Sequence, residues 1–171
     1  MQYIMKCSFL SGLLLFLLFS GPAMAWRGTV EDVLAGDILT VKEEGSSRGT
    51  LLRLYGVDAP EMAEPGLEGQ PFGLEAFELA RQLLPKGQRV VIHDMRQDTM
   101  GRDKGGIVTL PGGVTLQEEL LKAGLAWVTS LHCGNCRDWK SVQQAAREAK
   151  RGLWRDESPE PPWEWRLKHR Q

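Results

Sequence analysis

The sequence predicts an α+β fold that is mainly β, with five strands rolled into a barrel and three helices. Two patterns lead to this expectation. Short runs of β-branched and apolar residues, separated by turn-forming residues, recur along the chain and are typical of consecutive strands. Other segments carry apolar residues at three- and four-residue steps, which predicts helices. With 42% hydrophobic and 25% charged residues in a chain of 171, the composition is that of one ordinary folded domain.

The five strands are expected at residues 26–34, 38–43, 50–56, 88–94 and 105–110. A glycine–aspartate turn separates the first two, and a polar turn rich in glycine and serine separates the second from the third. Three short strands joined by tight turns must curl to bury one face. A helix between the third and fourth strands then fits a small Greek-key barrel of the OB type.

The three helices are expected at residues 72–84, 115–124 and 137–151. In the first, Phe77 and Leu84 belong to an apolar repeat of helical spacing. The second opens on a Thr-Leu-Gln-Glu capping-box sequence and ends at a glycine. The third carries an apolar stripe and also stops at a glycine.

The first 25 residues have the organisation of a secretory signal peptide. Lys6 gives a short positive start, an apolar run follows at 9–19, and small residues precede a cleavage position after Ala25. An uncleaved membrane anchor is the alternative, which the short apolar run disfavours. We therefore expect export to the periplasm or the medium, without membrane insertion after cleavage, and a folded domain at 26–158.

Residues 159–171 form a segment rich in proline, tryptophan and basic residues, which predicts an extended C-terminal tail. Trp163 and Trp165 could dock back on the barrel. The basic cluster at 166–170 is expected to be solvated, as terminal charge runs usually are, although a nucleic-acid contact is an alternative.

The charge balance bounds the kind of partner. Across the whole chain, 21 Lys and Arg stand against 22 Asp and Glu, a formal net charge of −1. Loss of residues 1–25 removes Lys6 and no acid, leaving 20 basic against 22 acidic residues, a net −2. Proteins that coat nucleic acid usually carry a basic excess. Any affinity for polyanions must therefore come from local positive charge and from metal, which favours an enzyme that turns over.

The chemistry-bearing segment is 53–61, where an expected strand runs into Asp-Ala-Pro-Glu. Proline ends the strand, because it lacks an N–H and disfavours helix at the preceding residue. Arg53, Asp58 and Glu61 can then meet near one strand end. An acid for metal, an acid for proton transfer and an arginine for phosphate are the parts of a phosphodiester-cleaving site.

Two further residues would complete such a site. Asp37 follows a glycine at the start of the second strand, and Arg102 lies on a glycine-containing loop after the fourth. Carboxylate oxygens suit a hard cation such as Ca²⁺. The alternatives are that Asp37 and Asp58 are turn acids, that Glu61 stabilises a helix N-terminus, and that the arginines form surface ion pairs.

Six short segments, in this order, resemble the staphylococcal nuclease-like (thermonuclease) family. They lie at 35–38, 53–61, 98–102, 124–127, 152–154 and 162–164. The resemblance covers nearly the whole chain after residue 25, and the segment 53–61 is its most specific part.

The resemblance implies a Ca²⁺-dependent phosphodiester hydrolase, an endonuclease that acts on DNA, on RNA or on both. It also implies that Asp37, Asp58 and the backbone carbonyl of Ala59 hold the calcium. Ala35 and Ile38 depart from the family pattern D-G-D-T, in which an acid and a threonine stand at these positions. These departures suggest a weakened calcium site.

The family assigns catalysis to positions matched here by Glu61, as the base or the group that orders water, and by Arg53 and Arg102, which hold the scissile phosphate. We expect a monomer. Two rival functions remain at this point. One is a catalytically weakened OB-fold module of the cell envelope that binds nucleic acid. The other is an envelope interaction domain that docks through its tryptophan-rich tail.

Cys133 and Cys136 form a C-x-x-C pair in a chain that we expect to be exported. A local disulfide is the interpretation that an oxidising compartment favours. A redox-active pair, free thiols and a zinc site with His132 are alternatives, but two thiols and one histidine leave zinc one ligand short.

Overall fold

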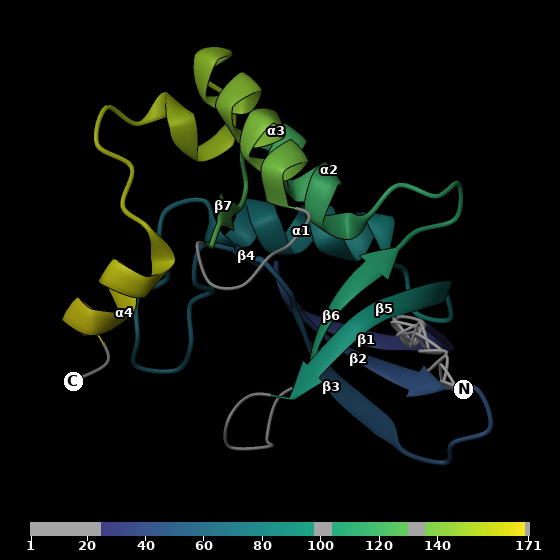
Figure 1. Ribbon diagram of the computed structural model, residues 1–171. Coiled ribbons are helices and arrows are strands. Elements are labelled where there is room, and N and C mark those ends of the chain that lie inside the picture. Colours follow the sequence, from purple (N-terminus) through teal and green to yellow (C-terminus); the bar gives the residue numbers. More distant parts are fainter. Residues whose placement is uncertain (1–24, 98–103, 130–135, 170–171) are drawn as a thin grey trace, which may run out of the picture.

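The computed structural model describes residues 25–97, 104–129 and 136–169 (Figure 1). Five strands close into a barrel, as the sequence predicts. In barrel order they are β1 (Trp26–Ala35), β2 (Ile38–Glu43), β3 (Gly49–Leu54), β6 (Lys104–Thr109) and β5 (Arg89–Gln97). Neighbouring strands are antiparallel except for β3 and β6, which pair in parallel. The parallel pair places the start of β6 beside the end of β3.

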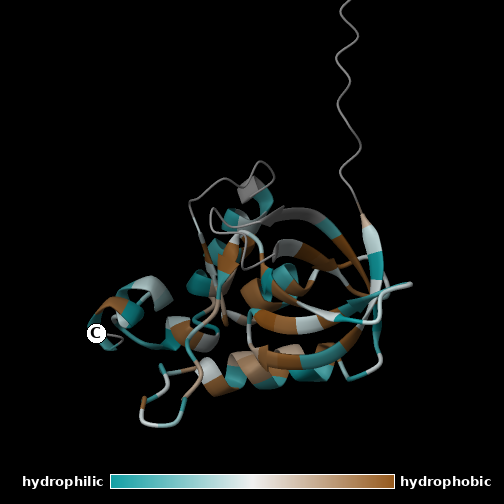
Figure 2. Cartoon of the chain, turned by 90° about the horizontal axis from the view of Figure 1, so that it is seen from below, coloured by the Kyte–Doolittle hydropathy of each residue, from teal (hydrophilic) through white to brown (hydrophobic). Residues whose placement is uncertain are grey.

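The barrel interior is apolar because side chains alternate in and out along each strand. Val30, Leu39, Val41, Leu52 and Ile92 are all at most 1% exposed. Figure 2 shows hydrophobic positions concentrated in the strands and in the helices against them, with hydrophilic positions in the outer turns. The core therefore gives a rigid frame to the polar groups at its rim.

The three predicted helices cover one end of the barrel (Figure 1). They are α1 (Gly73–Leu83), α2 (Leu116–Ala123) and α3 (Cys136–Glu148). Helix α1 contacts β1, α2 contacts β6 and α1, and α3 contacts α2. The capping box is confirmed, since Thr115 Oγ1 accepts from the Glu118 N–H at 3.1 Å and Glu118 Oε2 accepts from the Thr115 N–H at 3.0 Å.

Two glycine-containing segments meet where α2 ends and the 3₁₀ turn η1 (Gly152–Arg155) begins. Gly124 has φ 70° and Gly152 has φ 53°. A Cβ on Gly152 would lie 2.2 Å from the Gly124 carbonyl oxygen, so only glycine permits this approach. The Leu153 N–H donates to the same carbonyl at 2.9 Å. Two separate glycine–leucine pairs in the sequence are thus halves of one contact.

The expected strand at 50–56 is shorter than predicted. Strand β3 ends at Leu54, and a separate two-residue strand β4 (Val57–Asp58) pairs antiparallel with β7 (Trp127–Val128). Gly56, with φ 78°, turns the chain between β3 and β4. Asp58 therefore sits on a small second sheet rather than at the end of the barrel strand.

The C-terminal segment is not extended, and that prediction is wrong. Residues Pro162–His169 form a fourth helix, α4. Proline at its first position fits, because the ring fixes a helical φ and the missing N–H has no partner in a first turn. Trp163 contacts Trp127 of β7, with ring centroids 5.9 Å apart, and so docks on the small second sheet rather than on the barrel. Among the described residues, no helix has the length and apolarity to cross a membrane.

The C-x-x-C pair cannot be placed. Cys133 and His132 lie outside the described residues, and the side chain of Cys136 does as well. The disulfide stays a prediction.

Candidate active site

A groove of about 720 Å³ lies at the rim of the barrel, bounded by the β1–β2 turn, β3, β4 and α4. Three residues predicted from the sequence, Arg53, Asp58 and Glu61, line it together with Arg166. Asp37 is buried beside them and only 4% exposed. Arg102 lies outside the described residues. The groove therefore gathers most of the predicted site.

The turn that carries Asp37 is held tightly against the segment after β4. A Cβ on Gly36 would lie 2.9 Å from Ala59 Cβ and 2.8 Å from Ala76 Cβ, which leaves room only for glycine. The Leu54 N–H donates to the Asp37 carbonyl at 2.8 Å and ties the turn to the end of β3. These contacts bring Asp37 next to Ala59, although 22 residues separate them in the sequence.

The carboxylate of Asp37 is only partly neutralised. Arg53 Nη1 donates to Asp37 Oδ2 at 3.2 Å, and the Arg53 side chain is 44% exposed. Burial raises the pKa of Asp37 to about 6; Arg53 opposes this shift, while the charges of Asp58 and Glu61 add to it. A buried acid near two other acids, with one half-exposed arginine, is an environment that favours a bound cation.

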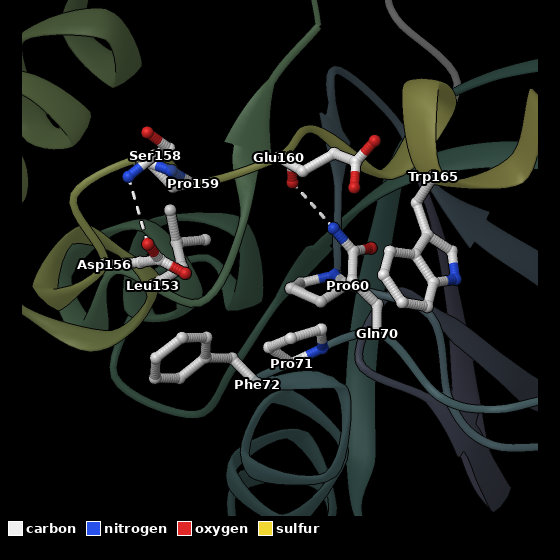
Figure 3. Close-up of a pocket in the computed structure, with 10 residues that line it drawn as sticks. All are labelled: Pro60, Gln70, Pro71, Phe72, Leu153, Asp156, Ser158, Pro159, Glu160 and Trp165. Atoms are coloured by element: carbon white, nitrogen blue, oxygen red, sulfur yellow. Dashed lines mark hydrogen bonds between the residues drawn. The ribbon is translucent and has the colours of Figure 1, made fainter. Parts of the chain in front are cut away.

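The backbone around Glu61 is fixed by Gln70, which sequence reasoning missed. The Glu61 N–H donates to Gln70 Oε1 at 3.2 Å, and the Gln70 N–H donates to the Glu61 carbonyl at 2.9 Å. Gln70 Nε2 donates to the Glu160 carbonyl at 2.6 Å, a bond drawn in Figure 3. Gln70 is 6% exposed. One buried amide thus links the Glu61 loop to the segment before α4.

Arg166 is the second residue that the sequence did not reveal, and its contacts correct the expectation of solvation for this member of the basic cluster, whereas Lys168 and His169 are exposed. Arg166 Nη1 donates to Asp58 Oδ1 at 3.0 Å, and Nη2 donates to Oδ2 at 2.7 Å, a two-pronged pair. Nη1 also donates to Glu61 Oε1 at 2.5 Å. The hydrogen bond to Asp58 is the main cause that raises the pKa of Arg166.

The acidic groups have the chemistry of a calcium site. Asp37 and Asp58 offer oxygen donors, both are buried, and a guanidinium stands in as the counter-charge at Asp58. In the part of the chain that the structure describes, no three His, Cys, Asp or Glu side chains gather as a metal cluster. Backbone carbonyl and water oxygens would have to complete the shell, and the buried Ala59, adjacent to Asp58 in the chain, offers one such carbonyl.

The signal for Arg166 in the sequence is weak. It follows the Pro-Trp-Glu segment at 162–164 by two residues, which marks the segment but not the arginine. The partner acid lies 108 residues away. Gln70 gives even less, because a glutamine in a proline- and glycine-containing loop has no pattern that marks it as buried.

Comparison with known proteins identifies the family to which the chain is similar. The profile of a family described as "Staphylococcal nuclease homologue" matches residues 51–156. That range contains Arg53, Asp58 and Glu61 but begins after Asp37 and ends before Arg166. The profile therefore does not bear on Asp37 or Arg166, whose place in the site comes from the contacts described above.

Three relatives illustrate the similarity. An Escherichia coli protein named "Uncharacterized endonuclease" is 32% identical over 155 residues, covering 90% of this chain and 94% of that protein. The "Probable staphylococcal-like nuclease CAN1" of Oryza sativa subsp. japonica is 34% identical over 125 residues, 72% of this chain and 34% of that protein. The "Probable endonuclease LCL3" of Schizophyllum commune is 28% identical over 152 residues, 81% of this chain and 51% of that protein.

Proposed function

The chain belongs to the staphylococcal nuclease family as an endonuclease, a phosphodiester hydrolase, and we propose that it cleaves DNA, with RNA as a second substrate, in a calcium-dependent reaction. The observation that carries the proposal is the meeting of Asp37, Asp58, Glu61 and Arg53 at one groove. Acids for a hard cation, an acid for proton transfer and an arginine for phosphate are what phosphodiester hydrolysis requires.

Asp37 and Asp58, with the carbonyl of Ala59, are the residues that would hold calcium. When bound, calcium would supply positive charge against the non-bridging phosphate oxygens. The raised pKa of Asp37 supports this assignment, because burial without a full counter-charge disfavours the carboxylate and a cation would relieve that cost.

Glu61 is the proposed proton acceptor for the attacking water. Its backbone is held by two hydrogen bonds to Gln70, so its carboxylate has a defined place at the groove. A base must lie within hydrogen-bond reach of the proton it takes, and a fixed backbone is what holds it there.

Arg53 is the proposed ligand of the scissile phosphate. Its side chain is 44% exposed at the groove, and its Nη1 donates to Asp37, so further donors of the guanidinium face the groove for phosphate oxygens. Arg102 is proposed as the second phosphate arginine from the sequence resemblance. Both would stabilise charge that builds up in the transition state.

We also propose that the protein is exported, to the periplasm or the medium. The support is the signal-peptide organisation of residues 1–25. Expression in a bacterial host, followed by N-terminal sequencing of the mature protein, tests it. Cleavage after Ala25 is the expected result, and an intact N-terminus in the cytosol would contradict it.

The function is tested by cleavage of labelled single-stranded DNA and RNA by the purified protein. We expect cleavage with Ca²⁺, none with excess chelator, and recovery when calcium is restored. Asp58→Asn should lose the calcium response. Cleavage that ignores the chelator would contradict the calcium dependence. Retained binding of the strand without cleavage would instead indicate a nucleic-acid-binding module.

A further inference from the structure

The guanidinium of Arg166 occupies the carboxylates that the proposed function assigns to metal and base. It contacts both oxygens of Asp58, at 3.0 and 2.7 Å, and one oxygen of Glu61, at 2.5 Å. Asp58 is 7% exposed and the Arg166 side chain 31% exposed. This is a partly buried, charge-assisted network and not a surface ion pair.

We propose that Arg166 is a further residue of the active site, a tethered cation that competes with calcium for Asp58 and holds Glu61 until calcium displaces it. The inference rests on the calcium-dependent function proposed above. It assigns to α4 the control of that site: with Arg166 in place, the protein is in a calcium-free and inactive state.

Competition follows from the geometry at Asp58. The two nitrogens of the guanidinium face the two oxygens of the carboxylate, so the fork covers the open side of the group. A hard cation would need the same oxygens. Two cations at one carboxylate also repel each other, most strongly where burial lowers the local dielectric. Arg166 and calcium therefore cannot both hold Asp58 at full strength.

The same contact blocks the proposed base. Arg166 Nη1 donates to one oxygen of the Glu61 carboxylate, so the guanidinium occupies a position from which the attacking water would have to reach that oxygen. While Nη1 of Arg166 binds Glu61 Oε1, that oxygen is also turned to the guanidinium rather than to water. Release of Arg166 would free the metal ligand and the base together.

Helix α4 can move Arg166 away from Asp58 while its N-terminal side stays attached to the domain. It has eight residues, too few to be stable alone, so its position depends on its contacts. Its N-terminal side is anchored: Pro162 is buried, and Gln70 binds the carbonyl of Glu160. Its C-terminal side is more open, with Leu167 74% exposed and Lys168 64% exposed, although Lys168 pairs with the half-buried Glu160.

Between these ends, Trp165 borders a cavity of about 130 Å³ together with Pro60 and Gln70 (Figure 3). The cavity joins α4 to the loop that carries Glu61. Gln70, which also borders the cavity, bonds to both the Glu61 backbone and the Glu160 carbonyl, so the loop and the start of α4 share one anchor.

The test is calorimetric titration of the purified protein with calcium at pH 7.5. We expect Arg166→Gln to bind calcium about tenfold more tightly than wild type, a difference of about 1.4 kcal/mol. Arg166→Lys, which keeps the charge and loses the fork, should fall between them. The matched control is Lys168→Gln, which removes the same charge from the same helix at a fully exposed position and should match wild type.

A second measurement follows α4 directly. Amide hydrogen exchange of residues 162–169 should be faster in wild type with saturating calcium than with chelator, since the helix loses its anchor at Asp58. In Arg166→Gln the exchange should be fast in both conditions.

Equal or weaker calcium binding by Arg166→Gln would overturn the proposal, as would the absence of calcium binding in both proteins or an exchange rate in wild type that ignores calcium. These outcomes are separate from the fate of the proposed function. Calcium-dependent cleavage with unchanged affinity would leave the function standing and remove the competition. Tighter calcium binding without cleavage would do the reverse.

Discussion

The two sides of the active site solve the same electrostatic problem differently. On the barrel side, Asp37 meets Arg53 through one hydrogen bond of 3.2 Å, and the arginine is 44% exposed. On the tail side, Asp58 meets Arg166 through two bonds of 3.0 and 2.7 Å, and the arginine is 31% exposed. Each side pairs a buried acid with an arginine, but only the second pair is fully formed.

The difference indicates which arginine has spare capacity. Arg53 keeps donors for a phosphate and leaves Asp37 under-neutralised, so its pKa rises to about 6. The guanidinium of Arg166 donates its hydrogen bonds to the carboxylates of Asp58 and Glu61. In the proposed mechanism, the barrel side receives calcium and substrate, and the arginine of the tail side is displaced.

The largest effect is expected from Glu61→Gln. Loss of a general base costs about 10²- to 10⁴-fold in turnover, and the isosteric amide should leave the fold intact. The measurement is the single-turnover cleavage rate at saturating calcium, with circular dichroism to verify folding. The control is Glu64→Gln, another acid at the same groove three residues on, which should cleave at the wild-type rate.

Full activity in Glu61→Gln would remove the base assignment and leave Glu61 as a loop residue. Equal losses in both variants would indicate that the negative charge of the groove, and not a specific base, supports catalysis.

Arg53→Lys should lower the single-turnover rate about 10²-fold. The lysine keeps the charge but cannot present two donors to phosphate oxygens, and loss of one transition-state donor typically has this size. Arg48→Lys, on the exposed β2–β3 turn, is the matched control and should be silent. A loss confined to substrate affinity, with the bound rate unchanged, would move Arg53 from transition-state contact to ground-state binding.

The pH dependence of the free energy of unfolding should reveal the cost of burying the Asp37 carboxylate. Its folded pKa is raised to about 6 from 3.8, so the stability it contributes is present below about pH 4 and is lost as the pH rises through 6. In chelator, Asp37→Asn should therefore gain stability relative to wild type between pH 4 and 7, measured by urea unfolding. A constant difference across that range would show that Asp37 is not strained in the metal-free protein.

The smallest effect is expected from Gln70→Ala. In the wild type, the Gln70 amide links the Glu61 loop to the segment before α4 through their backbones. The substitution leaves the Glu61 N–H and the Glu160 carbonyl without their partner, at a cost of about 1–3 kcal/mol. Thermal unfolding measures the loss. Gln82→Ala, exposed on α1, is the control. If both variants melt alike, the Gln70 amide does not hold the Glu61 loop.

The positions of Asp37 and Arg53 on the barrel side could be predicted from the sequence, because they depend on nearby residues and on adjacent strands. The glycine at 36 and the alternation through Arg53 determine where Asp37 and Arg53 point, and residues 16 apart on paired strands must meet. The five strands and three helices were predictable for the same reason: turn residues, capping boxes and apolar periods lie within each element.

The place of Arg166 on the tail side could not be predicted from the sequence, because it depends on a contact with an acid 108 residues away. Pro159, Pro161 and Pro162 indicated an extended segment, yet the proline at 162 begins α4 instead, and the buried position of Pro162 and the tryptophans supply the packing that a short helix needs. The separation of β4 from β3 was also missed, because Gly56 turns the chain within a run that otherwise has a strand pattern.

The most direct test of the account is a calcium titration of wild type and Asp58→Asn by calorimetry. The control is Asp156→Asn, which changes an exposed acid directly after η1. The account predicts one calcium site in wild type and in the control. It predicts that affinity in Asp58→Asn falls at least about 100-fold, as expected for the loss of a charged ligand. Identical isotherms for the three proteins would place the calcium elsewhere and contradict the assignment of Asp37 and Asp58.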